Sequence, residues 1–166
     1  MSAGSADNRP HRAWPRTGTH PSPSTPAAIR RGPKHLFVYG TLRSGSAHPM
    51  ARLLAERADR VCDAELRGRL YLVASYPGAV DPTCRRDSVR GDLFRLHDAY
   101  EMLKRLDRYE DAIRSDGEFV RRVRPVVALP NGERIEAWVY LYNRSTHALR
   151  RIASGDFMAA AALRHP

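Results

Sequence analysis

An acidic residue at the end of an apolar helical stripe is the first feature of this sequence that points to chemistry. Leu106 closes the stripe of a helix predicted over 98–110, and Glu110 continues the same face at the i+4 position. A carboxylate that faces a core loses hydration, and the helix C-terminus adds negative potential, so both effects raise its pKa and suit a general base. In the alternative interpretation the helix ends one turn earlier and Glu110 points into water. The nearby Asp107 is a weaker candidate, because it lies about 100° off the stripe.

A strand-to-helix turn earlier in the chain is the second feature. The run from Leu36 to Tyr39 is typical of a buried strand, Gly40 interrupts it, and a helical pattern begins near Pro49. Backbone N–H groups in such a turn can hold a carboxylate or a phosphate, and glycine lets a ligand approach the main chain closely. The turn lacks the spacing of a phosphate-binding P-loop or a dinucleotide fingerprint, and most turns of this kind only connect elements.

Composition and charge predict one globular domain with a basic surface. The chain has 166 residues, of which 42% are hydrophobic, and a formal net charge of +10. No nucleic-acid-binding motif accompanies the charge, so a solvated basic surface is favoured over a nucleic-acid partner. Cys62 and Cys84 lack the spacing of a zinc site and are expected to be reduced. No run is long enough for a membrane span and no signal peptide is evident, which predicts a cytoplasmic protein without a membrane partner.

Three regions of different composition divide the chain. Residues 1–33 are rich in Pro, Ser, Thr, Gly and Arg, and we expect them to form a disordered tail. Residues 34–157 carry the alternating and helical patterns of a folded domain. The alanine-rich residues 158–166 are expected to form a C-terminal tail, either as a short helix or frayed.

The folded region is predicted to be α+β. Helices are expected at 49–59 and 98–110, and strands at 35–39, 61–73, 88–96, 118–129 and 133–142. Turns are predicted at 76–78 and at Pro130-Asn131-Gly132. The last strand is apolar on both faces, which predicts a central position. These elements favour a small mixed β-barrel or curled sheet of about five to six strands with two main flanking helices.

Several short motifs follow one another along the folded region in a specific order. They are Val38-Tyr39-Gly40-Thr41-Leu42-Arg43, Gly68 with Tyr71, Tyr76-Pro77-Gly78, Val89-Arg90-Gly91-Asp92-Leu93-Phe94, Leu106-Asp107-Arg108-Tyr109-Glu110, Ala137-Trp138-Val139-Tyr140 and Ser154-Gly155-Asp156-Phe157. In order and spacing, over about residues 35–157, the chain resembles the γ-glutamylcyclotransferase-like family, also called the AIG2-like family. Two positions depart from the family pattern: Phe157 replaces a Trp, and Phe119 stands where members often carry Tyr.

The resemblance implies a fold, a reaction and two groups of site residues. A small barrel with flanking helices would enclose a cavity. The backbone of Tyr39, Gly40, Thr41 and Leu42 would bind the α-carboxylate of a γ-glutamyl substrate, and Glu110 would be the acid/base residue. The implied reaction cyclises the γ-glutamyl group to 5-oxoproline and releases a free amine. It uses no metal ion and no organic cofactor.

Two other functions stand as alternative hypotheses. The same fold could serve as a non-catalytic module that binds a small molecule, although an unpaired acid on an apolar stripe favours an enzyme. A nucleic-acid-associated role would rest on the basic residues 1–33 and predicts salt-sensitive retention on DNA. The sequence does not define the leaving amine, the oligomeric state or the role of the tail, and the missing hydroxyl at Phe119 bears on specificity.

Overall fold

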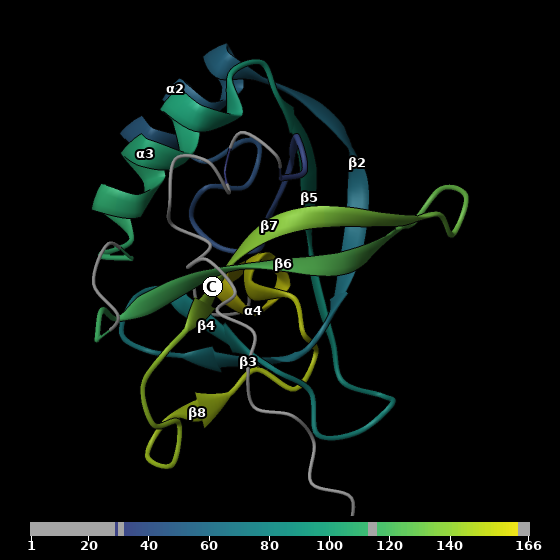
Figure 1. Ribbon diagram of the computed structural model, residues 1–166. Coiled ribbons are helices and arrows are strands. Elements are labelled where there is room, and N and C mark those ends of the chain that lie inside the picture. The colour runs from purple at the N-terminus through teal and green to yellow at the C-terminus, as the bar shows by residue number, and fades with distance from the viewer. Residues whose placement is uncertain (1–28, 30–31, 113–115, 163–166) are drawn as a thin grey trace, which may run out of the picture.

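In a computed structural model of the protein, the described part of the chain is residue 29 together with residues 32–112 and 116–162. The strands are β1 (His35–Val38), β2 (Ala58–Arg67), β3 (Arg69–Leu72), β4 (Pro77–Val80), β5 (Ser88–Leu96), β6 (Phe119–Ala128), β7 (Arg134–Tyr142) and β8 (Arg150–Arg151). The helices are α2 (Pro49–Arg57), α3 (Ala99–Tyr109) and α4 (Phe157–Ala162). Figure 1 shows their arrangement.

Five strands close into a barrel in the order β1-β5-β2-β6-β7. Neighbouring strands are antiparallel except at the closure, where β1 and β7 run parallel with Leu36 opposite Trp138. β7 lies between β6 and β1 and is buried from Ala137 to Leu141, so its predicted central position is confirmed. The predicted α+β class, with a small mixed barrel and flanking helices, is also confirmed.

Gly68 separates the barrel from a second sheet of three strands, ordered β4-β3-β8. The prediction of one strand over 61–73 is therefore wrong. β2 already begins at Ala58, and the chain passes from one sheet to the other at Gly68. A Cβ atom at Gly68 would lie 2.9 Å from the carbonyl oxygen of Val80, so this close approach of two backbones requires glycine.

The two outer strands of the second sheet differ from the sequence-based expectations. β4 includes residues that were expected to form the turn 76–78, and β8 has only two residues. Both are defined by their antiparallel pairing with β3. Strands this short carry no alternating pattern of their own, which explains why eight strands are found where five to six were predicted.

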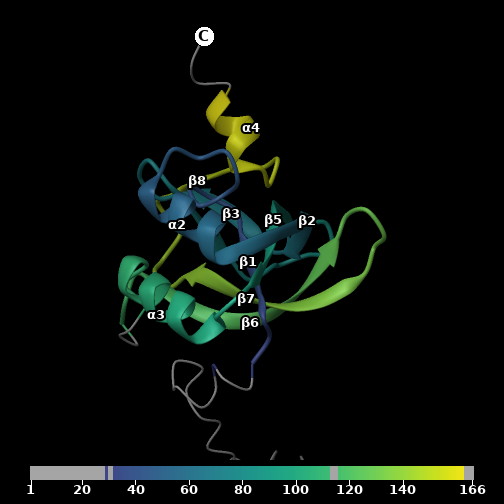
Figure 2. The same ribbon diagram turned by 90° about the horizontal axis from the view of Figure 1, so that it is seen from above.

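Two capped helices lie at the same end of the barrel (Figures 1 and 2). α2 starts after His48, whose Nδ1 accepts the N–H of Met50 at 3.2 Å. α3 starts after Asp98, whose carboxylate accepts the N–H of Glu101 at 3.1 Å. Apolar side chains of both helices pack into one core cluster with residues of β1 and β7. α2 ends two residues before the predicted position, because β2 begins directly after it.

The chain before β1 contributes to the core. Most of the tail predicted for 1–33 lies outside the described residues, but Ile29 is described and only 4% exposed, and it belongs to the core cluster of α2 and α3. The indole N–H of Trp138 donates to the carbonyl oxygen of Pro33 at 2.8 Å. The boundary of the packed region therefore falls before the predicted residue 34.

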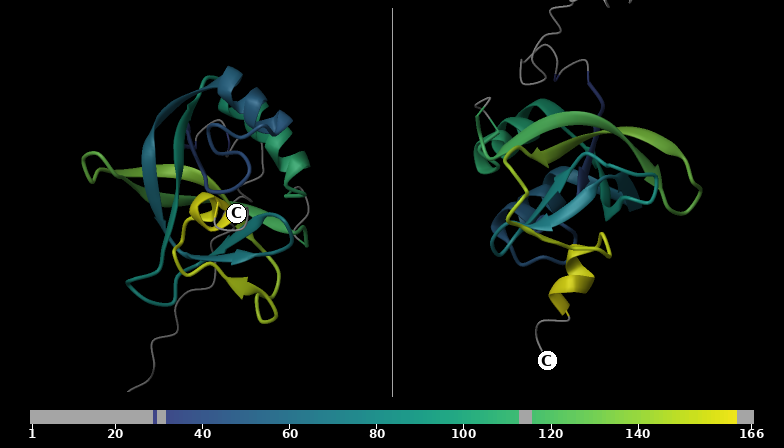
Figure 3. Two further views of the ribbon diagram at one scale, coloured as in Figure 1. Left: turned by 180° about the vertical axis from the view of Figure 1, so that it is seen from behind. Right: turned by 90° about the horizontal axis from the view of Figure 1, so that it is seen from below.

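The C-terminal region begins with α4, which projects from the side of the three-stranded sheet and away from β6 and β7 (Figure 3). α4 runs to Ala162, and residues 163–166 of the predicted tail lie outside the described residues. Among the described helices, none combines the length and apolar character of a membrane span.

Candidate active site

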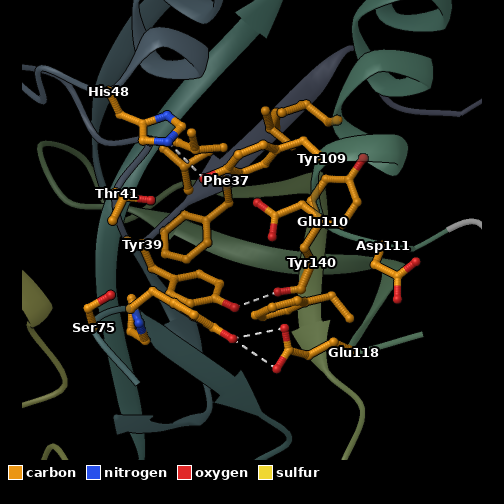
Figure 4. Close-up of a pocket in the computed structure, with 18 residues that line it drawn as sticks. Phe37, Tyr39, Thr41, His48, Ser75, Tyr109, Glu110, Asp111, Glu118 and Tyr140 are labelled. Carbon is orange, nitrogen blue, oxygen red and sulfur yellow. Dashed lines mark hydrogen bonds between the residues drawn. The ribbon is translucent and has the colours of Figure 1, made fainter. Parts of the chain in front are cut away.

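A cavity of about 360 Å³ lies beside the C-terminal end of α3 (Figure 4). Its walls come from β1 and the turn after it, the loop before β4, the end of α3, the start of β6 and Tyr140 of β7. These segments are far apart in the sequence, and the barrel closure between β1 and β7 brings them together. The charged side chains among the described lining residues are Glu110, Asp111 and Glu118, which are all acidic.

The turn after β1 forms one wall of the cavity. Tyr39, Gly40, Thr41 and Leu42 all line it, so the four residues predicted to bind substrate lie together. The N–H of Arg43 closes the turn by donating to the Gly40 carbonyl oxygen at 3.1 Å. Within the described chain, the N–H groups of Thr41 and Leu42 form no hydrogen bond with protein atoms. They are therefore available to an anionic ligand.

Gly40 is required by a close contact and not by its backbone angle. Its φ is not in the left-handed region, which the described glycines Gly45, Gly132 and Gly155 occupy. A Cβ atom at Gly40 would instead lie 2.8 Å from Cγ of Pro77. The missing side chain thus lets the start of β4 pack against the turn.

The Tyr39 side chain anchors this wall to the barrel. Its buried hydroxyl donates to the carbonyl oxygen of Tyr140 at 2.6 Å and accepts the N–H of Ala79 at 3.2 Å. Desolvation raises the pKa of Tyr39 far above its usual value, so the phenol stays neutral at any physiological pH. Both bonds fix the end of β1, from which the turn starts.

Glu110 lies on the opposite wall, where α3 ends. It is the C-cap residue, and its N–H donates to the Leu106 carbonyl oxygen at 2.8 Å. The side chain is half-buried and points into the cavity, toward Tyr39 (Figure 4). Burial, and secondarily the charge of Glu118, raise the pKa of Glu110 from 4.5 to about 7. Of the two interpretations left open by the sequence, the structure supports the one in which this carboxylate faces a desolvated pocket.

A second carboxylate, which the sequence reasoning missed, faces the same cavity. Both carboxylate oxygens of Glu118 lie 2.9 Å from the Tyr76 hydroxyl, which donates to them (Figure 4). Desolvation, and next this hydrogen bond, raise the pKa of Tyr76 to about 12. Glu118 directly precedes β6 and was predicted as the first residue of that strand, where no local pattern distinguishes it from an exposed polar residue. Phe119, where the family often has Tyr, lines the cavity beside it.

The acid placed off the apolar stripe, Asp107, is buried in the structure. It is 7% exposed, and its Oδ1 accepts the Tyr140 hydroxyl at 2.7 Å and lies 3.3 Å from Nε of Arg121. Asp107 thus lies off the apolar stripe but within the core. Helix α3 is covered by the barrel over a wider arc than its apolar stripe, and this arc includes a charge that Arg121 compensates.

His48 and Tyr109 connect the two helices beside the cavity. Nε2 of His48 lies 3.2 Å from the Tyr109 hydroxyl, and the two rings meet edge to face at a centroid distance of 5.2 Å. Because Nδ1 accepts the backbone N–H of Met50, the neutral imidazole carries its proton on Nε2 and donates it to Tyr109. This contact joins the start of α2 to the last residue of α3.

A comparison with protein families identifies the family to which this chain belongs. The family model described as "Gamma-glutamyl cyclotransferase, AIG2-like" matches residues 36–159, which include both walls of the cavity. The chain belongs to this family. The match extends from β1 into α4 and leaves out Ile29 and the residues before it.

Relatives and solved structures agree with the assignment. The chain is 33% identical over 127 residues to the gamma-glutamylcyclotransferase family protein YtfP of Escherichia coli K12, covering 74% of this chain and 95% of that protein. The fold is similar to that of an AIG2-like protein from Mus musculus, with a TM-score of 0.57 at 21% identity, covering 72% and 86% of the two chains. It is also similar to YkqA of Bacillus subtilis, with a TM-score of 0.62 at 20% identity over 80% of this chain. The match spans 42% of the YkqA chain.

Proposed function

We propose that the protein is a γ-glutamyl cyclotransferase that converts a γ-glutamyl amine or peptide into 5-oxoproline and a free amine. The observation that carries this proposal is the half-buried carboxyl group of Glu110, which faces the free N–H groups of the turn after β1 across one cavity. An acid with a pKa of about 7 can both accept and return a proton at neutral pH. Membership of the family supports the same reaction.

Substrate binding starts with the α-carboxylate. Backbone N–H groups of Thr41 and Leu42 would receive it, since they have no partner within the described protein. The α-ammonium group, one carbon away, would then lie toward Glu110. This placement brings a cation to a desolvated carboxylate, which favours the ionised form of Glu110 when substrate is bound.

The chemical step is an intramolecular aminolysis. The Glu110 carboxylate removes a proton from the α-ammonium group, and the resulting amine attacks the γ-carbonyl carbon to form the ring C–N bond. The Glu110 carboxyl group delivers this proton to the leaving nitrogen as its bond to the γ-carbon breaks, and the regenerated carboxylate accepts the second proton of the ring nitrogen and passes it to the released amine, which leaves as an ammonium ion. Nucleophile and electrophile belong to one molecule, so orientation in the cavity supplies much of the rate enhancement.

The charge of the cavity defines which leaving amines are accepted. Its described charged lining residues are Glu110, Asp111 and Glu118. A leaving amine that carries a carboxylate would be repelled, whereas a neutral or cationic amine would not. We therefore propose that neutral and cationic leaving amines are preferred over leaving amino acids.

The alternative is a non-catalytic module that binds γ-glutamyl compounds in the same cavity. Such a module would gain nothing from a carboxyl group whose ionisation is disfavoured by burial. Product release separates the two functions, because a binding module retains its ligand unchanged.

The proposal is tested by measuring 5-oxoproline release from a matched substrate series. N-γ-glutamyl derivatives of 1,4-diaminobutane, pentylamine and 5-aminopentanoate share one four-carbon spacer and end in a cation, a methyl group or an anion. We expect turnover of the first two and at least about tenfold lower kcat/KM for the third, because one unfavourable charge contact of about 1.4 kcal/mol is a factor of ten. Binding of all three without 5-oxoproline release would support the binding module. Equal turnover of all three would contradict the proposed preference for neutral and cationic leaving amines.

A further inference from the structure

Three buried polar side chains lie next to the cavity wall that carries Glu110. Asp107 of α3, Arg121 of β6 and Tyr140 of β7 are 7%, 0% and 5% exposed. Groups of this kind are costly to bury unless they are hydrogen-bonded or paired with an opposite charge. The chemistry proposed above uses the Asp107 carboxylate and the Arg121 guanidinium in no step.

The three groups hold one another in fixed positions. The Tyr140 hydroxyl donates to Oδ1 of Asp107 at 2.7 Å, and burial raises the pKa of Asp107 although this bond and the Arg121 charge act to lower it. Nε of Arg121 lies 3.3 Å from the same oxygen, and the guanidinium carbon lies 4.8 Å from the centre of the Trp138 ring. Arg121 and Tyr140 face each other in the register of β6 and β7. The end of α3 is thus attached to two adjacent strands of the barrel.

Tyr140 connects both walls of the cavity. Its hydroxyl is bonded to Asp107 on the helix that ends at Glu110, and its carbonyl oxygen accepts the Tyr39 hydroxyl at 2.6 Å on the strand that leads into the turn. One residue therefore links the acid/base wall through its side chain and the anion-binding wall through its backbone.

We propose that the Tyr140 hydroxyl is a positioning group, which acts through Asp107 to set the location of the Glu110 carboxyl group relative to the turn after β1. Glu110 follows Asp107 by three residues, close to one helical turn. A small shift of the helix end is therefore transmitted directly to the carboxyl group. This inference rests on the proposed function for its kinetic part only.

Replacement of Tyr140 by Phe removes the hydroxyl alone and so tests its contribution. The ring still fills the core and lines the cavity, and the backbone bond from Tyr39 remains. The bond from the hydroxyl to Asp107 and its longer bond to the Leu103 carbonyl oxygen at 3.4 Å, both on α3, are lost. We expect kcat to fall about 10- to 100-fold, the range that follows from a misplacement of about 1 Å, while KM changes by less than about threefold because the turn after β1 stays anchored.

A second measurement does not depend on turnover. Carbon-13 NMR of the glutamate carboxyl groups reports the titration of Glu110 directly. With the helix end loosened, its carboxyl group gains hydration, so we expect its pKa to fall from about 7 toward 4.5 in Tyr140→Phe, with the Glu118 charge unchanged. If no γ-glutamyl compound is turned over by the wild-type protein, the proposed function fails and this titration still tests the positioning role.

Tyr71→Phe is the matched control. Tyr71 is also buried, and its hydroxyl accepts a hydrogen bond from Arg69 at 3.1 Å, but it lies on β3 and does not line the cavity. It should lose stability without changing kcat or the Glu110 titration. Wild-type kcat together with an unchanged Glu110 titration in Tyr140→Phe would overturn the proposal.

Asp107→Asn provides an independent variant if Tyr140→Phe fails to fold. The amide oxygen still accepts the Tyr140 hydroxyl, whereas the charge opposite Arg121 is removed. We expect kcat to fall less than in Tyr140→Phe when both are measured per folded molecule, or by less than about tenfold if only this variant folds. A larger loss would assign the effect to the charge pair and overturn the role of the hydroxyl.

Discussion

The Tyr76 hydroxyl lies 2.9 Å from each carboxylate oxygen of Glu118 and holds this second acid in the cavity that contains Glu110. The two carboxylates come from opposite ends of the segment between α3 and β6. Their mutual repulsion adds to the desolvation that raises the pKa of Glu110. Glu118 thereby influences both the charge of the pocket and the proton affinity of the proposed acid/base residue.

Replacing Glu118 by Gln should make Glu110 a stronger acid. Gln still accepts the Tyr76 hydroxyl, so the geometry is retained while one negative charge is removed. The acid limb of the kcat/KM profile, which reports the free enzyme, should therefore move from about pH 7 to lower pH. The measurement is 5-oxoproline release between pH 5 and 9. An acid limb at the wild-type position would show that Glu118 does not act on Glu110.

Replacing Glu110 by Gln should abolish turnover and preserve the fold. Gln is nearly isosteric but does not accept the α-ammonium proton at neutral pH, so we expect a loss of at least about 10²–10⁴-fold in kcat, the usual range for a positioned acid/base group. Glu101→Gln, an exposed change on the same helix, is the control and should behave as wild type. Near-wild-type release by folded Glu110→Gln would remove Glu110 from the mechanism.

The same variant should gain stability at neutral pH. The pKa of Glu110 is higher in the folded state, so folding favours the protonated carboxyl group, and wild-type stability is lost as the pH rises from about 4.5 to about 7. Glu110→Gln has no carboxyl group to ionise at this position, so it does not lose this stability as the pH rises. Its free energy of unfolding should exceed that of wild type by about 1–3 kcal/mol at pH 8 and match it more closely at pH 4.5. Urea unfolding at both pH values checks this, and an equal difference at the two pH values would contradict it.

Adding a side chain at Gly40 should weaken substrate binding. A Cβ atom would lie 2.8 Å from Cγ of Pro77, so the turn or the start of β4 must move. Binding to Gly40→Ala, and more so to Gly40→Val, can be measured calorimetrically in the Glu110→Gln background without turnover. Gly132→Ala is the control, because its φ of 71° makes it destabilising at a site outside the described cavity lining. Unchanged affinity in folded Gly40→Val would refute the anion-binding role of the turn.

Two truncations should differ in stability. Deleting residues 1–26 removes the part whose composition predicts no core contribution, and should leave the free energy of unfolding unchanged. Deleting residues 1–33 also removes the buried Ile29 and the Pro33 carbonyl that accepts the Trp138 indole, and should cost at least about 1.5–3 kcal/mol. The thermal unfolding midpoints of both truncated proteins, compared with the full chain, measure this difference in stability. Equal midpoints would show that Ile29 contributes nothing to the core.

Local sequence patterns were enough to predict the elements that position the site. The stripe ending at Leu106 predicts a helix over 98–110, which agrees with α3 within one residue at each end, because helix periodicity is a property of residues close together in the chain. The apolar run before Gly40 likewise predicts β1. The strand predicted over 61–73 failed, because the exchange of sheets at Gly68 depends on how closely Val80 approaches it from a distant segment.

The sequence by itself determined the α+β class, the family resemblance, the turn after β1 and the acidic residue at the end of α3. Only the tertiary structure decided which other polar groups surround them. Tyr76 and Glu118 are 42 residues apart, and Tyr140 and Asp107 are 33 residues apart. Their pairing follows from the closure of the barrel and the packing of α3 on it. No spacing rule within the chain predicts contacts at such separations, because they depend on burial and on strand register.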